Sequence, residues 1–251
     1  MKFARFSIGE QIYTGVLENN QLKAIQGCMF QDWTYTGETF TLDQVKLLAP
    51  LVPNQIIGIG ANFVATKEEL PNELPQIPIF FSKPVVSVIG PEDEVKIPES
   101  VDEIKFESEL AVIIGKEMKN VAKEDVLDYV FGYTVANDIT APQFFVNSSN
   151  WFVGKSFDTF TPLGPVIETE LDPKDVVVEA YVNGVQKQNS STALMIVPIR
   201  EMIAYLSTVM TLKPGDVILT GSPIGAEFIG NHDEIVCEIK QIGVLKNRLI
   251  K

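Results

Sequence analysis

Short segments in which hydrophobic and polar residues alternate dominate the chain, and this pattern is typical of β-strands with one buried face. Residues 1–50 carry a loose form of the alternation and predict short strands joined by turns. The dipeptide Asn183-Gly184 predicts a tight hairpin, because both residues tolerate positive φ angles. The clearest further strands are expected at residues 56–60, 78–84, 106–115, 133–138, 176–182, 217–219, 235–239 and 244–250.

Helical periodicity is confined to short stretches. Pro198 stands at a favourable helix start, and the face of one helix is marked by Ile199, Met202, Ile203 and Leu206. We also expect short helices at residues 41–48 and 125–131. Because strands predominate and do not alternate regularly with helices, the sequence predicts a β-rich α+β fold with a mixed sheet or roll.

Two prolines, Pro50 and Pro53, mark the best candidate for a domain boundary. We therefore expect a small N-terminal β domain at residues 1–53 and a main catalytic domain at residues 54–251. The polar stretch at residues 61–78 predicts a long loop. A loop of this kind is either a functional lid or a solvated surface segment.

Composition restricts the chemistry that the chain can perform. The net charge of -13 argues against nucleic-acid and anionic-membrane partners, which need clustered basic residues. No apolar run approaches the roughly 18 residues of a membrane-spanning helix, and no signal peptide is apparent. Two cysteines and one histidine exclude a disulfide framework and a histidine-rich metal site, and predict a cytoplasmic protein. Catalysis must rest mainly on carboxylates, lysines and backbone groups.

Three carboxylates form the first candidate site. Glu107 and Glu109 are two residues apart on a predicted strand, so both side chains leave the same face. Asp138 ends the next predicted strand, and a strand–helix–strand connection would return it beside the pair. Three carboxylates without histidine or cysteine suit Mg²⁺, Mn²⁺ or Ca²⁺. The alternative is that the two glutamates lie on the solvent face of an edge strand.

Two further segments are candidates for anion binding. Lys155 lies among glycine and aromatic residues, and it either reaches into a pocket as a point charge or lies along the surface. Residues 219–225 lead from a strand into a turn of glycine, serine and proline. The backbone N–H groups of such a turn can hold a substrate carboxylate, although an ordinary loop has the same composition.

Taken together, these segments resemble the fumarylacetoacetate hydrolase family across residues 55–248. The matching stretches are residues 58–63, 79–83, 106–115, 132–141, 154–165, 182–192, 203–207, 214–225 and 242–247. The resemblance implies a mixed β-roll core, a small N-terminal β domain and a homodimer. It implies Glu107, Glu109 and Asp138 as ligands of Mg²⁺ or Mn²⁺. It further implies substrate contacts by Asn62, Lys155, Thr220 and Gly221.

The chain departs from the family pattern at two places. Hydrolytic members carry N-Y-x-x-H-x-x-E, whereas this chain has Thr66 at the histidine position and keeps only the glutamate, as Glu69. Threonine cannot serve as a general base near pH 7. After Asp138 the family usually reads S-A-R-D-x-Q; here the arginine is absent, and Gln143 is the candidate for its substrate contact. The only histidine, His232, is expected in an exposed or structural turn.

These features predict a divalent-metal-dependent enzyme that acts on a small 2-oxo acid through a metal-bound enolate. Decarboxylation needs only an electron sink, and isomerisation needs a proton shuttle, for which Glu69 and Lys155 are the candidates. Hydrolysis needs an activated water, so the missing histidine favours decarboxylation or keto–enol or double-bond isomerisation. The alternatives are C–C hydrolysis of acylpyruvates, a catalytically weak protein that binds 2-oxo acids, and a structural dimer with an empty site.

Overall fold

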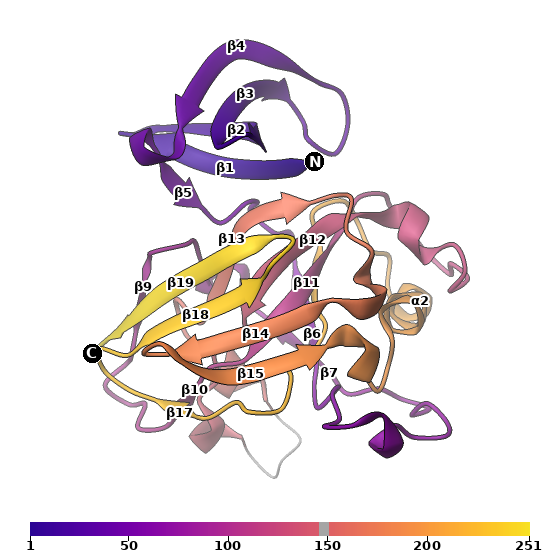
Figure 1. Cartoon of the computed structure of the whole chain (residues 1–251). Coiled ribbons are helices and arrows are strands. Elements are labelled where there is room, and N and C mark those ends of the chain that lie inside the picture. Colours follow the sequence, from indigo (N-terminus) through magenta and orange to yellow (C-terminus); the bar gives the residue numbers. More distant parts are fainter. Residues whose placement is uncertain (146–150) are drawn as a thin grey trace.

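The computed structural model describes residues 1–145 and 151–251, which form mainly β-sheet (Figure 1). The largest sheet has 12 strands. These are β1 (Lys2–Ile8), β2 (Gln11–Glu18), β3 (Gln21–Gly27), β4 (Trp33–Thr41), β5 (Lys46–Leu48), β6 (Ile56–Ile59), β7 (Phe80–Lys83), β8 (Val88–Ile89), β11 (Ser108–Ile114), β12 (Val130–Asn137), β13 (Thr161–Glu168) and β16 (Val217–Leu219). Their order is β4-β3-β2-β1-β13-β12-β11-β16-β6-β7, with β5 paired to β1 and β8 to β13.

Two smaller sheets complete the fold. A five-stranded sheet has the order β15-β14-β18-β19-β9, and β10 pairs with β17. Their bounds are β9 (Glu94–Lys96), β10 (Ile104–Lys105), β14 (Val177–Val182), β15 (Val185–Ser191), β17 (Phe228–Ile229), β18 (Glu234–Ile239) and β19 (Gly243–Ile250). Three strand pairs are parallel, namely β8–β13, β6–β16 and β9–β19. The other strand pairs among the described residues, such as β11–β12, are antiparallel. The prediction of a β-rich α+β fold with mixed sheets is therefore confirmed.

The helices match the sequence pattern only in part. The predicted helix after Pro198 is α2 (Ile199–Val209), which buries Met202, Ile203 and Leu206. The helix expected at residues 41–48 is wrong: a 3₁₀ turn at Leu42–Gln44 leads into β5, which pairs with β1. The helix expected at residues 125–131 shortens to a 3₁₀ turn, after which β12 begins. Short helices are marginal alone, so pairing with an existing sheet prevails over local preference.

Strand β11 lies at the centre of the molecule, between β12 and β16, and every residue in it is buried. Its alternate side chains enter two hydrophobic clusters. Leu110 and Val112 pack with residues of the five-stranded sheet such as Val178, whereas Ala111 and Ile113 face the opposite cluster. Burial on both faces explains why residues 110–114 form a continuous apolar run. It also gives the residues at its start a rigid support.

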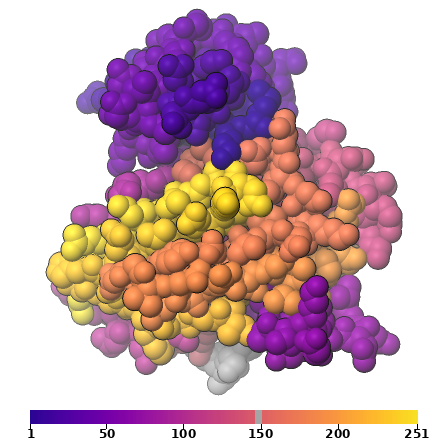
Figure 2. Space-filling model, in the orientation of Figure 1, coloured from indigo at the N-terminus to yellow at the C-terminus, as the bar shows by residue number. Residues whose placement is uncertain are grey.

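The N-terminal strands form the upper lobe of the molecule in Figures 1 and 2, and they continue the large sheet. Strand β1 pairs with β13 through Phe3 and Ile167. The Phe3 ring lies 5.6 Å from the Trp33 ring and 5.2 Å from the Phe131 ring, measured between centroids. The lobe and the main body thus share one sheet and one hydrophobic cluster. A domain boundary at residue 53 stays a prediction.

Candidate metal and substrate site

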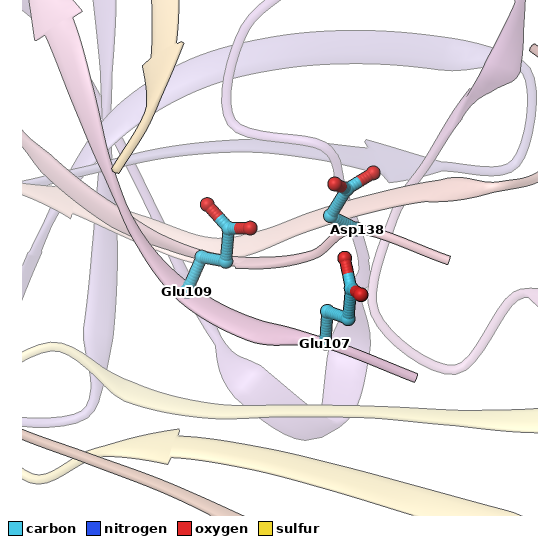
Figure 3. A group of neighbouring side chains, drawn as sticks. All are labelled: Glu107, Glu109 and Asp138. Carbon is cyan, nitrogen blue, oxygen red and sulfur yellow. The ribbon is translucent and has the colours of Figure 1, made fainter. Parts of the chain in front are cut away.

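Three carboxylates converge at the point where β11 begins and β12 ends (Figure 3). Glu107 precedes β11, Glu109 lies within it, and Asp138 directly follows β12. The antiparallel register places Asp138 beside Glu107, and the Asp138 N–H donates to the Glu107 carbonyl oxygen at 2.8 Å. One carboxylate oxygen from each residue lies within 4.8 Å of the others. The structure therefore brings the predicted triad together, and its role as a ligand set stays a prediction.

Two buried lysines surround the triad, and each is only 3% exposed. The Lys155 ammonium, presented by the short helix α1 (Phe152–Lys155), contacts Glu107 Oε2 at 2.6 Å and also contacts Asp138 Oδ2. Lys83, the last residue of β7, donates to Asp138 Oδ1 at 2.6 Å and to the Ile139 carbonyl oxygen at 3.0 Å. Sequence reasoning missed Lys83, although it ends one of the stretches that match the family.

The charges in the site are unevenly balanced. Burial raises the pKa of Glu109 well above its ordinary value, and the Asp138 carboxylate adds to this effect. Burial also raises the pKa of Glu107 despite the neighbouring Lys155 ammonium. Burial opposes ionisation of Asp138 too, but Lys155 and Lys83 outweigh it and hold the pKa of this carboxyl below its usual range. The site therefore combines two carboxyls that resist ionisation with one that is held ionised.

The donor set of this triad fits a hard divalent cation. Each residue offers a carboxylate oxygen, which is the ligand type that Mg²⁺ and Mn²⁺ prefer. Glu109 Oε2 accepts a hydrogen bond from the Gly221 N–H at 2.7 Å. Within residues 1–145 and 151–251, no lysine or arginine makes an ion pair with Glu109. A cation at the triad would supply the positive charge that this buried carboxylate lacks.

The predicted substrate contacts Asn62 and Thr220 hold the site together through internal hydrogen bonds. The Thr220 hydroxyl donates to the Leu110 carbonyl oxygen at 2.7 Å, which ties the turn to β11. The Asn62 amide donates to the carbonyl oxygens of Thr220 at 2.9 Å and Val197 at 3.1 Å. The N–H of Gly221 is directed at Glu109. Contact of these three residues with a substrate stays a prediction.

Glu69 and Gln143 lie in short 3₁₀ turns, at Lys67–Glu69 and Pro142–Phe144. Glu69 ends a 3₁₀ turn, accepts the Ala65 N–H at 2.9 Å, and lines a cavity of about 460 Å³ together with Asn62. The Gln143 oxygen accepts the N–H groups of Asp102 at 2.7 Å and Glu103 at 2.8 Å. Gln143 would have to leave these bonds to contact a substrate, so both roles stay predictions. The histidine at position 232 is exposed in a turn, as expected.

The chain belongs to the fumarylacetoacetate hydrolase family. The family profile described as "Fumarylacetoacetate (FAA) hydrolase C-terminal" matches residues 55–250, and the profile "Rv2993c-like, N-terminal" matches residues 1–50. A mitochondrial oxaloacetate tautomerase of Xenopus laevis is 41% identical over 82% of this chain and 69% of the relative.

Solved structures give the same assignment. A 5-carboxymethyl-2-hydroxymuconate delta-isomerase from Mycobacterium smegmatis superposes with a TM-score of 0.93 at 34% identity, covering 100% of this chain and 99% of that one. A fumarylacetoacetate hydrolase from Exiguobacterium antarcticum superposes with a TM-score of 0.93 at 32% identity, with the same coverage. The predicted family and its fold are therefore confirmed.

The comparisons also confirm that the chain is an enzyme of this family, whose members generally use divalent metal ions. The names of the relatives span tautomerase, isomerase and hydrolase, so they leave the reaction itself to be inferred. In the part of the chain that the structure describes, no helix is long and apolar enough to cross a membrane. The cytoplasmic location stays a prediction.

Proposed function

We propose that this enzyme converts a small 2-oxo acid in a reaction that depends on a divalent metal and passes through an enolate. Keto–enol or double-bond isomerisation and decarboxylation are favoured. The observation that carries the proposal is the buried cluster of Glu107, Glu109 and Asp138, with Lys155 and Lys83 around it. Two relatives that are named as a tautomerase and an isomerase support the same class of reaction.

The charge of the cluster explains why an anionic substrate would bind. With all three carboxyls ionised, as metal binding requires, the carboxylates and the two ammonium groups together carry a net charge of −1, which does not attract an acid. A bound Mg²⁺ or Mn²⁺ ion, held by Glu107, Glu109 and Asp138, would reverse this charge and stabilise negative charge that develops on a 2-oxo group. The buried surroundings strengthen these interactions because the effective dielectric constant is low.

The lysines can orient the substrate and move protons. Lys155 Nζ lies against both Glu107 and Asp138, so a substrate bound at the triad would come within reach of this ammonium. Burial lowers the pKa of Lys83, whereas the Asp138 and Glu107 carboxylates raise the pKa of Lys155 even though burial opposes this. Two ammonium groups with opposite shifts can separate the tasks of holding an anion and exchanging a proton.

The position of Thr66 argues against hydrolysis as the main reaction. Thr66 directly precedes the 3₁₀ turn that contains Glu69, where hydrolytic members of the family carry a histidine. A proton shuttle suffices for tautomerisation, whereas hydrolysis requires a base that activates water. The second candidate function is C–C hydrolysis of an acylpyruvate, which the retained Glu69 and the hydrolase-named relative favour.

Turnover assays with oxaloacetate and with acylpyruvates, each with and without a divalent metal ion, test the proposal. We expect the enzyme to accelerate enol-to-keto conversion of oxaloacetate, or its decarboxylation, in Mg²⁺ or Mn²⁺ but not in EDTA. Glu109→Gln should abolish this rate, whereas Glu94→Gln, on the exposed face of β9, should leave it unchanged. Saturable oxalate binding without any turnover would instead indicate a binding protein.

A second variant tests the interpretation of Thr66, which lies in the loop at residues 61–78. Thr66→His should raise acylpyruvate cleavage, because it restores a histidine three residues before Glu69. If the wild type hydrolysed acylpyruvates faster than it isomerised or decarboxylated any substrate, the alternative function would be established. We also propose a homodimer, on the basis of the family resemblance; sedimentation at the monomer mass of 27.8 kDa would contradict it.

A further inference from the structure

Gln188 lies on β15, away from the triad in sequence, yet its side chain is only 1% exposed. The side-chain oxygen accepts the Ser108 N–H at 3.0 Å. The side-chain nitrogen donates to Ser222 Oγ at 2.6 Å and to the Pro223 carbonyl oxygen at 2.6 Å. Both donors of the amide are therefore used, and the side chain is fixed in one orientation.

The partners of Gln188 are the two segments that place Glu109. Ser108 is the residue directly before Glu109 on β11. Ser222 directly follows Gly221, whose N–H holds Glu109 Oε2 at 2.7 Å. Gln188 therefore links the backbone directly before Glu109 to the turn whose Gly221 N–H donates to the Glu109 carboxylate.

A second observation shows how closely the turn and β15 are joined. A Cβ atom at Gly225 would lie 2.1 Å from the Lys187 carbonyl oxygen, so the backbone of the turn rests directly on the strand. Gly225 also adopts a φ of +111°, which side chains rarely tolerate. The turn is therefore fitted to β15 by backbone contact and by the Gln188 amide together.

We propose that Gln188 is a positioning residue that sets the orientation of Glu109 for metal binding. This inference rests on the proposed metal site. Gln188 acts through the Ser108 N–H on one side and through the 220–223 turn on the other. Because Glu109 forms no ion pair among the described residues, its carboxylate depends on this hydrogen-bonded frame. Groups that hydrogen-bond a metal ligand directly typically change metal affinity about 10–100-fold when they are removed, and Gln188, which acts one bond further away, should fall at the lower end of that range.

The test compares two glutamines on the same strand. Gln186 is exposed, and its amide bonds Glu179 Oε1 at 2.7 Å and the Tyr181 hydroxyl at 3.1 Å, away from the triad. We expect Gln188→Met to weaken Mn²⁺ binding about tenfold, while Gln186→Met stays near the wild-type affinity. The free Mn²⁺ signal in electron paramagnetic resonance gives the affinity without turnover. Thermal unfolding in EDTA shows that both variants are folded.

Two milder variants keep the inference testable if Gln188→Met does not fold. Ser222→Ala removes one of the three bonds and should weaken Mn²⁺ binding about 2- to 10-fold, the effect of one hydrogen bond. Gln188→Glu keeps an acceptor for the Ser108 N–H but loses both donors to the turn. Its added negative charge would by itself favour a cation, so a weaker affinity in this variant reports the lost donors.

The possible failures are distinguishable. Wild-type affinity in Gln188→Met, or in Ser222→Ala if Gln188→Met does not fold, would overturn the positioning role while leaving the proposed function intact. An equal loss in Gln186→Met would show that the effect is a general disturbance of β15, which also overturns it. A wild-type protein that binds no Mn²⁺ would overturn both the metal site and the role of Gln188.

Discussion

Replacing Lys83 with methionine removes one of the two positive charges on Asp138 while keeping most of the apolar stem. The ion pair between Lys83 and Asp138 is 2.6 Å long, and the two side chains are 0% and 1% exposed. Removing one partner of a buried pair typically costs about 3–5 kcal/mol, because the other charge remains buried. Lys155 still contacts Asp138, so we expect about 3 kcal/mol, the lower end of that range.

For a chain of this size, 1 kcal/mol shifts the melting temperature by about 2–4 °C, which gives a decrease of about 6–12 °C for Lys83→Met in EDTA. Differential scanning calorimetry measures this shift directly. Added Mn²⁺ should raise the melting temperature of the variant more than that of the wild type, because it replaces the missing positive charge.

The matched control is Lys46→Met. The Lys46–Asp93 pair is also 2.6 Å long, but the lysine is 59% exposed. A surface pair contributes at most about 1 kcal/mol. If Lys83→Met melted no lower than Lys46→Met, the buried network would not stabilise the protein in the way that its geometry indicates.

Three further predictions concern the turn, the thiols and the N-terminal lobe. Gly221→Ala should weaken Mn²⁺ binding at least about tenfold, because at φ +92° its Cβ would lie 2.6 Å from Asn62 Cβ. The control Gly37→Ala, at φ +93° with open space around the new Cβ, should bind Mn²⁺ normally. Equal affinities in the two variants would contradict this prediction. Burial raises the pKa of Cys237 to about 12, so a thiol reagent should label only the exposed Cys28 until the protein unfolds, and rapid labelling of both would refute this. The lobe of β1–β5 should melt with the main body in one calorimetric transition, because both share a hydrophobic cluster; two separated transitions would argue for independent domains.

The strands and the carboxylate triad were predictable because their signals are local. The apolar run at residues 110–114 marks a buried strand, and the spacing of Glu107 and Glu109 at its start fixes the face that they share. An adjacent antiparallel strand then brings in Asp138, although the connection contains only a 3₁₀ turn where a helix was expected. Such features follow from backbone geometry and need no knowledge of distant partners.

The remaining features depend on contacts between residues far apart in sequence. Lys83 meets Asp138 across 55 residues, and Gln188 meets Ser108 across 80 residues. Neither the spacing nor the composition of either segment specifies its partner. The prediction of a helix at residues 41–48 was wrong for the same reason. Pairing of this segment with β1 decides its conformation. Local pattern therefore predicts where polar residues lie, while the fold decides what they contact.

The junction between β1 and β13 has a consequence for any shortened form of the protein. Deleting residues 1–53 would uncover the backbone groups of Ile167 and Glu168 that pair with β1. It would also expose Phe131 and Leu163, which share a cluster with Phe3. An open strand edge beside apolar side chains is a template for association between chains. The isolated catalytic portion would therefore tend to aggregate, and the N-terminal lobe serves as the cover that keeps this edge closed.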